Sequence, residues 1–147
     1  MNPDNGDVVW RTNIGTGGPN GGIHWGIAAD DTHIYAPISN VGRPVATDPA
    51  YDVNAIKPGL YALNLDDGSI AWQFNTTPDC PDERKARLPG CQRLAGISAA
   101  PSVIGDYVVA GGLDGTLYVL DRKTGALKWK YDTARKYTGA NGVEGNG

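Results

Sequence analysis

The sequence predicts an all-β protein made of repeated four-stranded antiparallel units, and three observations lead to this prediction. A turn glycine followed by a strand tryptophan occurs three times, with the tryptophans at positions 10, 72 and 129. The chain contains 21 Gly and 10 Pro but only one Met and one Phe, a composition that suits short strands joined by turns. No long stretch shows the apolar periodicity of an amphipathic helix.

The tryptophans recur roughly 60 residues apart, and self-similarity at such a period predicts the blades of a β-propeller. In the second blade we expect strands at 25–29, 33–38, 59–65 and 69–75. In the third blade we expect strands at 97–103, 107–111, 116–121 and 126–132. The prediction is a partial propeller of about two and a half blades in one domain, with residues 1–14 ending a preceding blade, 25–76 forming the second and 97–133 the third. We therefore expect the chain to be part of a longer propeller.

The repeated residues have structural roles. Gly68 and Gly125 lie in the turns that precede two of the tryptophans, where glycine tolerates the positive φ of a tight hairpin. Third strands such as 116–121 are apolar at nearly every position, which is typical of a strand buried on both faces. The three tryptophans then fill the space between neighbouring blades. Other propellers, such as the WD type, share these strand lengths and turns.

Two segments resemble the tryptophan-docking repeat of quinoprotein dehydrogenases, which use pyrroloquinoline quinone (PQQ). They are Gly59-Leu60-Tyr61-Ala62-Leu63-Asn64 followed by Gly68 and Trp72, and Gly115-Thr116-Leu117-Tyr118-Val119-Leu120-Asp121 followed by Gly125 and Trp129. Residues 21–30, 97–101, 132–135 and 141–143 resemble the polyvinyl alcohol dehydrogenase branch in particular. His24 departs from that branch, in which a glutamate is expected before the tryptophan.

The resemblance implies a periplasmic or secreted bacterial enzyme that oxidises a small-molecule or polymeric alcohol, with PQQ and a calcium ion on the propeller axis. Hydride would pass from the alcohol to the quinone while an acidic residue takes the hydroxyl proton. No residue of this chain can be identified as that base. Cytochrome c is a candidate electron acceptor. A net charge of -3 gives no basic footprint for nucleic acid, and no apolar run is long enough to predict a membrane span.

The same fold is compatible with a second function. The protein would then be a scaffold without cofactor that binds extracellular partners or assists envelope protein assembly. Fold does not determine function, so the repeat alone cannot separate the two. The glycine-rich connection 15–26 favours the enzyme, because a scaffold has no need of it. For the isolated chain, open blade edges predict instability or association. We expect it neither to bind PQQ tightly nor to turn over alcohol.

The connections between one blade's outer strand and the next blade's inner strand line the cofactor face of a propeller. In the first of them, Gly22 would let the backbone approach a flat ligand. Trp25 is a candidate for stacking on the quinone, and His24 for bonding the cofactor or acting as a base. The alternative is that Trp25 packs in the blade and His24 is solvated. Further along the chain, Asn141 is a candidate ligand of the cofactor and of calcium, and Glu144 of calcium.

Two cysteines, Cys80 and Cys91, flank a polar loop. The absence of a nearby histidine or Cys-x-x-Cys motif makes a metal site there improbable. A disulfide across the loop fits an oxidising compartment, and the alternative is a pair of free thiols in the cytosol. A second insertion, 41–58, contains three prolines. We expect it to cover the cofactor face and to shape the substrate entrance.

Overall fold

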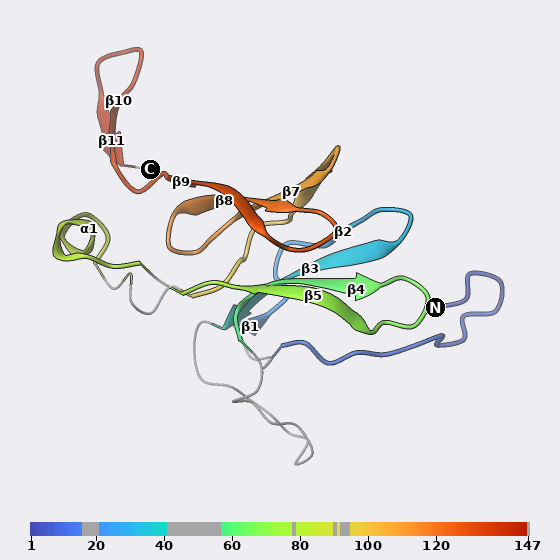
Figure 1. Cartoon of the computed structure of the whole chain (residues 1–147). Helices are drawn as coiled ribbons and strands as arrows, with labels where there is room; N and C mark the ends of the chain where they lie inside the picture. The colour runs from blue at the N-terminus through green and yellow to red at the C-terminus, as the bar shows by residue number, and fades with distance from the viewer. Residues whose placement is uncertain (16–20, 41–56, 78, 90, 92–94, 147) are drawn as a thin grey trace.

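The fold is all-β and consists of two antiparallel sheets packed face to face, with one short helix and a C-terminal hairpin (Figure 1). The computed structural model describes residues 1–15, 21–40, 57–77, 79–89, 91 and 95–146. The predicted all-β architecture is confirmed. The insertion that we expect to cover the cofactor face lies outside the described residues, except for Lys57 and Pro58.

The first sheet contains the strands expected for the second blade. Its strands are β2 (Ala28–Ala29), β3 (His33–Asn40), β4 (Gly59–Asn64) and β5 (Ile70–Asn75), each antiparallel to the next. A further strand, β1 (Gly21–Gly22), pairs with the far end of β3. Across the sheet, Tyr35 lies opposite Ala62, and Ala62 lies opposite Trp72.

The second sheet repeats this arrangement and is the third blade. Its strands are β6 (Ser102–Ile104), β7 (Tyr107–Gly111), β8 (Thr116–Asp121) and β9 (Leu127–Asp132). Val109 lies opposite Val119, and Val119 lies opposite Trp129. In both blades the register shifts directly after the residue that faces the tryptophan. A shared irregularity at the same position shows that the two sheets are copies of one structural unit.

The inner strands are shorter than predicted, because each is interrupted. In the second blade, β1 and β2 pair with opposite ends of β3, and residues 23–27 between them leave the sheet. In the third blade, Ile97 pairs with Gly112, after which the chain leaves the sheet until β6 begins at Ser102. The strand predictions at 25–27 and 98–101 are therefore wrong. The Ile97 amide also donates to the Ile38 carbonyl at 3.1 Å, so this edge links the two blades.

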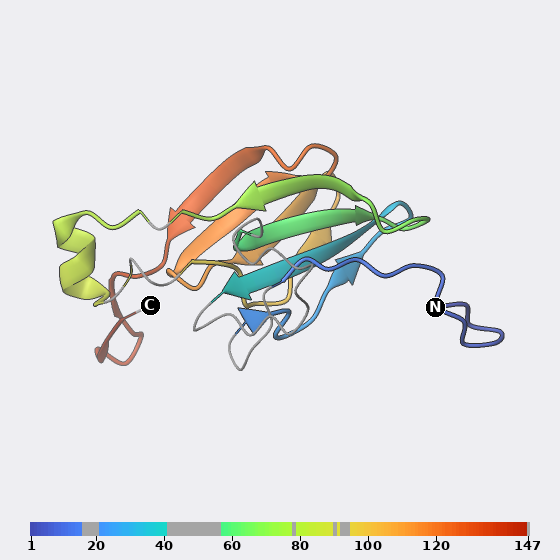
Figure 2. The same ribbon diagram turned by 90° about the horizontal axis from the view of Figure 1, so that it is seen from below.

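Residues 1–15 form the turn of the predicted hairpin but no strand. The Gly6 amide donates to the Asn2 carbonyl at 2.8 Å, and the Asn2 amide donates to the Asp7 carbonyl at 2.8 Å. No described residue supplies a partner strand to the segment that follows. This segment instead runs along the outer face of the second blade (Figure 2). There Ile14 and Trp10 pack with Ala36, Ile38, Tyr61 and Leu63.

We call the face of each blade that carries its tryptophan the forward face, and the opposite face the rear face. The forward face of the second blade packs against the rear face of the third, and together they form the main core. Because the N-terminal segment covers the rear face of the second blade, β4 is buried along nearly its whole length. In β8 buried positions alternate with partly exposed ones, so the prediction that this strand is buried on both faces is wrong. Among the described residues nothing covers the third blade's forward face.

Trp72 joins the two blades by packing on the turn between β8 and β9. Its indole Nε1 donates to the Arg122 carbonyl at 3.0 Å. A Cβ atom placed on Gly125 would lie 2.5 Å from the indole ring, and Gly125 has a φ of +70°. Glycine is therefore required at this position both by the backbone conformation and by the approach of the ring.

Trp10 makes the same contact one blade earlier. Its Nε1 donates to the Leu65 carbonyl at 2.9 Å, and a Cβ on Gly68 would lie 2.3 Å from its ring. Trp129 has no such turn within the described residues and is 49% exposed, whereas Trp72 is 8% exposed. The repeat thus joins each blade to the one that follows it.

We expect Trp72→Ala to lower the free energy of unfolding by about 3–5 kcal/mol, because it removes a large buried side chain between the blades. Trp129→Ala is the matched control and should cost less than about 1 kcal/mol, since the same residue type is half exposed there. Urea unfolding followed by circular dichroism measures both at low protein concentration. Equal losses in the two variants would contradict the docking role of Trp72.

Candidate functional site

His24 and Ser98 meet where the two interrupted inner strands leave their sheets. The register of the blades makes them equivalent positions, because His24 lies four residues before the partner of Tyr35 in β3 and Ser98 lies four residues before the partner of Val109 in β7. The His24 Nδ1 atom lies 2.8 Å from the Ser98 hydroxyl oxygen. His24 is exposed, whereas Ser98 is buried. A contact between equivalent positions of adjacent blades fixes the imidazole across the blade boundary.

This pair positions a histidine and does not form a serine nucleophile. A nucleophilic serine has to reach its substrate, and its histidine is normally oriented by a third group. Ser98 is buried, and within the described part of the chain no carboxylate bonds to the His24 ring. The buried hydroxyl can either donate to Nδ1 or accept from it, and it thereby sets which ring nitrogen carries the proton.

Trp25 follows His24 and is 77% exposed. It does not pack into the blade, so the structure gives it the exposure that a stacking residue needs. Gly26, with a φ of +135°, brings the chain against the third blade, where a Cβ would lie 3.8 Å from Ala100. Gly22 lies in β1 opposite Ser39, so its backbone belongs to the sheet pairing.

Asn141 and Glu144 lie in the hairpin of β10 (Lys136–Thr138) and β11 (Glu144–Asn146), which projects away from both blades (Figure 1). The Val143 amide donates to the Asn141 side-chain oxygen at 3.2 Å, and the Thr138 hydroxyl donates to the Glu144 carboxylate at 2.7 Å. Both side chains are therefore engaged within the hairpin. No group of three or more His, Cys, Asp or Glu among the described residues could hold a metal ion.

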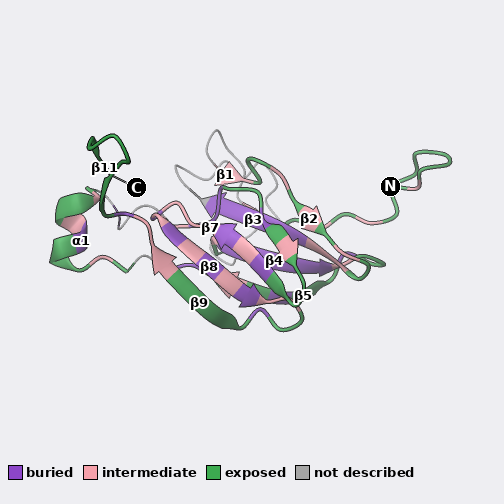
Figure 3. Ribbon diagram, turned by 90° about the horizontal axis from the view of Figure 1, so that it is seen from above, coloured by how far each residue is buried: buried purple, intermediate pink, exposed green. Residues whose placement is uncertain are grey.

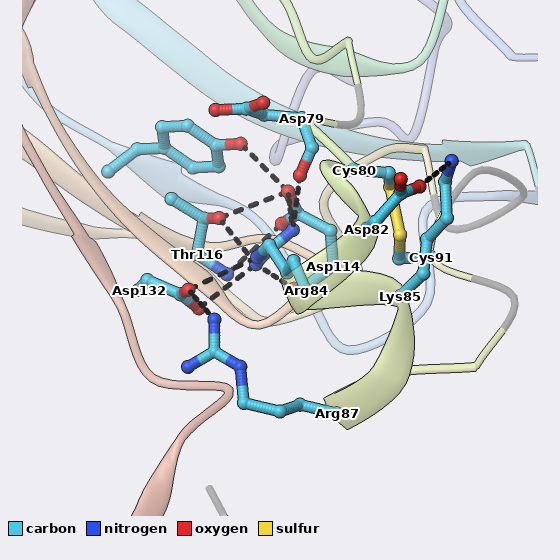
Figure 4. The surroundings of a disulfide bond; sticks show 11 residues. Asp79, Cys80, Asp82, Arg84, Lys85, Arg87, Cys91, Asp114, Thr116 and Asp132 are labelled. Atoms are coloured by element: carbon cyan, nitrogen blue, oxygen red, sulfur yellow. Dashed lines mark hydrogen bonds and ion pairs between the residues drawn. A yellow bond between two sulfur atoms is a disulfide. The ribbon is translucent and has the colours of Figure 1, made fainter.

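A buried arginine on the short helix α1 (Asp82–Arg87) points at the third blade (Figure 4). Arg84 is only 5% exposed. Its guanidinium donates to both carboxylate oxygens of Asp132, at 3.1 and 3.2 Å, and to the Thr116 hydroxyl at 3.3 Å. It also donates to the backbone carbonyls of Asp79, at 3.0 Å, and Asp114. Arg84 therefore fastens the polar loop that follows β5 to the third blade.

Sequence reasoning missed this cluster. An Asp-Gly pair is typical of a turn, yet the Asp114 carboxylate is buried and lies 3.5 Å from Arg84. The hydrogen bond from Arg84 lowers the pKa of Asp132, and the same bond raises the pKa of Arg84. Burial raises the pKa of Tyr118, and the nearby Asp114 charge adds to that effect. The only sequence signal was an arginine inside a loop closed by two cysteines.

A pocket of about 450 Å³ opens beside this cluster, between β5, α1 and the ends of β8 and β9. Charges of both signs line it, including Asp79, Glu83, Arg87 and Lys130. Neither His24 nor Trp25 contributes to it. Arg84 is engaged by its partners, and among the described residues that line the pocket no buried charged group lacks one.

Cys80 and Cys91 form the predicted disulfide, with their Cα atoms 6.1 Å apart. Cys91 is completely buried. The alternative of two free thiols is wrong for this structure. The bridge closes the loop that carries α1 and thereby limits how far Arg84 can move from its partners (Figure 4).

The structure contains two repeats of a propeller blade, and a comparison with known families agrees. The PQQ_2 family model, described as outer membrane protein assembly factor BamB, matches residues 19–146. The chain belongs to this family. The resemblance to PQQ-type propellers inferred from the tryptophan-docking repeats is confirmed.

Two curated relatives are polyvinylalcohol dehydrogenases. The protein from Sphingopyxis sp. (strain 113P3) is 35% identical over 137 residues, which is 92% of this chain and 19% of that protein. The protein from Pseudomonas sp is 30% identical over 135 residues, which is 91% of this chain and again 19% of that protein. The chain thus spans about a fifth of the length of either relative. The crystal structure of BamB from Moraxella catarrhalis is similar with a TM-score of 0.50 and 21% identity, covering 88% of this chain and 29% of that one, and it supports the propeller fold.

No helix among the described residues is both long enough and apolar enough to cross a membrane.

We expect Arg84→Met to lower the free energy of unfolding by about 3–5 kcal/mol, because it leaves the Asp114 carboxylate buried without the positive charge that pairs with it. Arg87→Met is the matched control on the same helix. Arg87 is 42% exposed and pairs with Asp132 at 3.5 Å, so its loss should cost less than about 1 kcal/mol. Urea unfolding at pH 7 measures both. A similar loss in both variants would contradict the bridging role of Arg84.

The ion pair between Arg84 and Asp132 predicts that the stability of the protein depends on pH in the acid range. The folded pKa of Asp132 is lowered below 3.8, so its stabilising contribution is present above about pH 4 and is lost as the pH falls through the folded value. Arg84→Met should therefore lose less stability between pH 4 and pH 2 than the unchanged protein does. Identical acid sensitivity in the two proteins would contradict this coupling.

Free-thiol titration of the non-reduced, denatured protein should find no reactive cysteine, because both sulfurs are in the bridge. Replacing both cysteines with serine should lower the free energy of unfolding by about 3 kcal/mol, since the loop is no longer closed in the unfolded chain. Two reactive thiols in protein purified without reductant would contradict the bridge.

Proposed function

We propose that this chain forms part of a PQQ-dependent dehydrogenase that oxidises hydroxyl groups of alcohols, polyvinyl alcohol among them. The observation that carries the proposal is the exposed Trp25 beside a histidine that is fixed across the blade boundary by Ser98. The similarity of more than nine-tenths of the chain to two polyvinylalcohol dehydrogenases supports it. A location in the periplasm or outside the cell is part of the proposal, and the disulfide supports it.

The residues of this chain fit one part of a quinone site. An exposed indole next to an imidazole and a chain of small residues suits the face and the polar edge of a flat ring system. In this structure Asn141 and Glu144 each make a bond within their hairpin, so calcium binding by either side chain would replace that bond. The proposal places the catalytic base and further calcium ligands in other blades of the longer protein.

When bound, PQQ supplies the acceptor for the hydride of the alcohol. Trp25 would bind one face of the quinone and exclude water from it. His24 would bond an oxygen at the edge through Nε2. If Ser98 donates to Nδ1, Nε2 carries the proton and donates to that oxygen, and if Ser98 accepts from Nδ1–H, Nε2 is free to accept a proton. The Ser98 hydroxyl thus determines what His24 offers to a ligand.

A second candidate function is a cofactor-free scaffold in envelope protein assembly. It is supported by the description of the matching family and by the absence of a metal-ligand cluster among the described residues. In that function Trp25 would bind an apolar side chain of a partner, since exposed aromatic residues are common anchors at interfaces.

The experiment is dye-linked oxidation of polyvinyl alcohol and of small secondary alcohols by the longer protein that contains this chain, loaded with PQQ and Ca²⁺. We expect turnover, and we expect Trp25→Ala to weaken PQQ binding about tenfold through loss of stacking. His33→Ala is the control, because His33 is the first residue of β3 and its imidazole contacts Thr32, Asp30 and Tyr35 and neither His24 nor Trp25. Failure of the longer protein to bind PQQ would reject the enzyme and leave the scaffold. The isolated chain should show no turnover.

A further inference from the structure

The pocket beside Arg84 lies between the two blades, and both blades contribute its walls. Lys130 lies opposite Tyr118 on the rear face of the third blade, and Phe74 lies opposite Leu60 on the forward face of the second. The rings of Phe74 and Tyr118 meet edge to face, with their centroids 5.3 Å apart. Because its walls belong to neighbouring blades and α1 of this chain, the pocket needs no blade beyond them to form.

The lining of this pocket favours a neutral ligand that is both apolar and rich in hydroxyl groups. Phe74, Tyr118 and Leu127 give it an apolar part. The charged part consists of three cationic and four anionic side chains: Arg84, Arg87, Lys130, Asp79, Glu83, Asp114 and Asp132. An ionic ligand of either sign would meet like charges there. A hydroxyl group both donates and accepts hydrogen bonds, so it suits carboxylates and cations alike.

Several of the charged side chains are accessible and only weakly paired. Both β9 and α1 are exposed along most of their length (Figure 3). The Lys130 Nζ atom lies 3.9 Å from the Asp79 carboxylate, and these side chains are 56% and 76% exposed. The Glu83 side chain makes no hydrogen bond or ion pair with another described residue. Exposed pairs of this kind contribute little to stability, so a hydroxyl group can replace them at little cost.

The pocket and His24 lie at the same end of the blades. His24 follows β1, which pairs with the end of β3, and the antiparallel order places the end of β5 at that end too. The Gly96 amide donates to the hydroxyl of Thr76, a pocket residue, at 2.7 Å, and Gly96 is two residues before Ser98. Three strand spacings separate β5 from β2, so the two places lie roughly 14 Å apart. A small alcohol cannot occupy both, whereas a chain with many hydroxyl groups can.

We propose that this pocket is a second binding subsite for a polymeric alcohol, occupied while another hydroxyl group of the same polymer chain reacts near His24. The inference rests on the proposed function, because it needs a hydroxyl-bearing substrate. Carbon atoms of the polymer pack on Phe74 and Leu127, and its hydroxyl groups bond Lys130 and Glu83. Two linked contacts on one molecule raise its apparent affinity, so the polymer binds more tightly than a small alcohol with the same reacting group.

Calorimetric titration of the longer protein without PQQ tests the subsite directly, with polyvinyl alcohol as the probe. We expect the polymer to bind and Thr77→Trp to weaken its binding at least about tenfold, because an indole at this exposed pocket residue fills the space. Ala86→Trp is the matched control, since Ala86 is exposed on α1 and does not line the pocket. Absence of polymer binding, or equal binding by the two variants, overturns the proposal.

Dye-linked turnover with PQQ and Ca²⁺ separates the subsite from the proposed function. Lys130→Met should lower the ratio of kcat/KM for polyvinyl alcohol to that for a small secondary alcohol about threefold, through loss of a hydrogen bond. Lys128→Met is the matched control on the same strand, because Lys128 pairs with Asp121 at 3.3 Å outside the pocket. No turnover of either alcohol by the unchanged protein rejects the proposed function. Turnover of both, with a ratio that neither Lys130→Met nor Thr77→Trp changes, overturns the subsite alone.

Discussion

The insertion of a tryptophan into the glycine turn of the following blade is the constraint on which the rest of the structure depends. Neighbouring blades share no continuous sheet, so side-chain packing and a few bridging hydrogen bonds keep them in register. Trp72 supplies both, through its ring against Gly125 and its bond to the Arg122 carbonyl. The docked blades also bring His24 to Ser98 across the same boundary. Loss of the docked ring would therefore disturb that contact as well.

The repeated parts of the fold were predictable from sequence, because the same packing requirement selects the same residue types in each blade. Gly68 with Trp72 and Gly125 with Trp129 identified the blades, and β7, β8 and most of β9 lie where apolar runs placed them. The inner strands were predicted too long. Their apolar residues continue past the point where the chain leaves the sheet, and sequence periodicity does not distinguish a paired residue from one that contacts the neighbouring blade.

The candidate site was only partly predictable. The glycine-rich connection directed attention to His24 and Trp25, but the partner of His24 lies 74 residues away and carries no motif of its own. The Arg84 cluster gave still less signal, since a charged helix inside a polar loop is usually solvated. Its burial depends on the blade angle and on the disulfide, neither of which is a local property of residues 82–87. Interactions that cross between repeats are therefore the ones that the sequence did not reveal.

The direction of the tryptophan contacts also has a consequence for synthesis on the ribosome. Each ring docks on a turn that lies further along the chain, by 55 residues for Trp10 and 50 for Trp72. A nascent chain emerges from its N-terminus at about 5–20 residues per second, so each indole remains solvated for on the order of 3–10 seconds before its turn exists. During that interval the newest blade exposes an apolar face at every stage of translation. During synthesis, the most recently completed blade is therefore always the one whose apolar face is exposed to solvent.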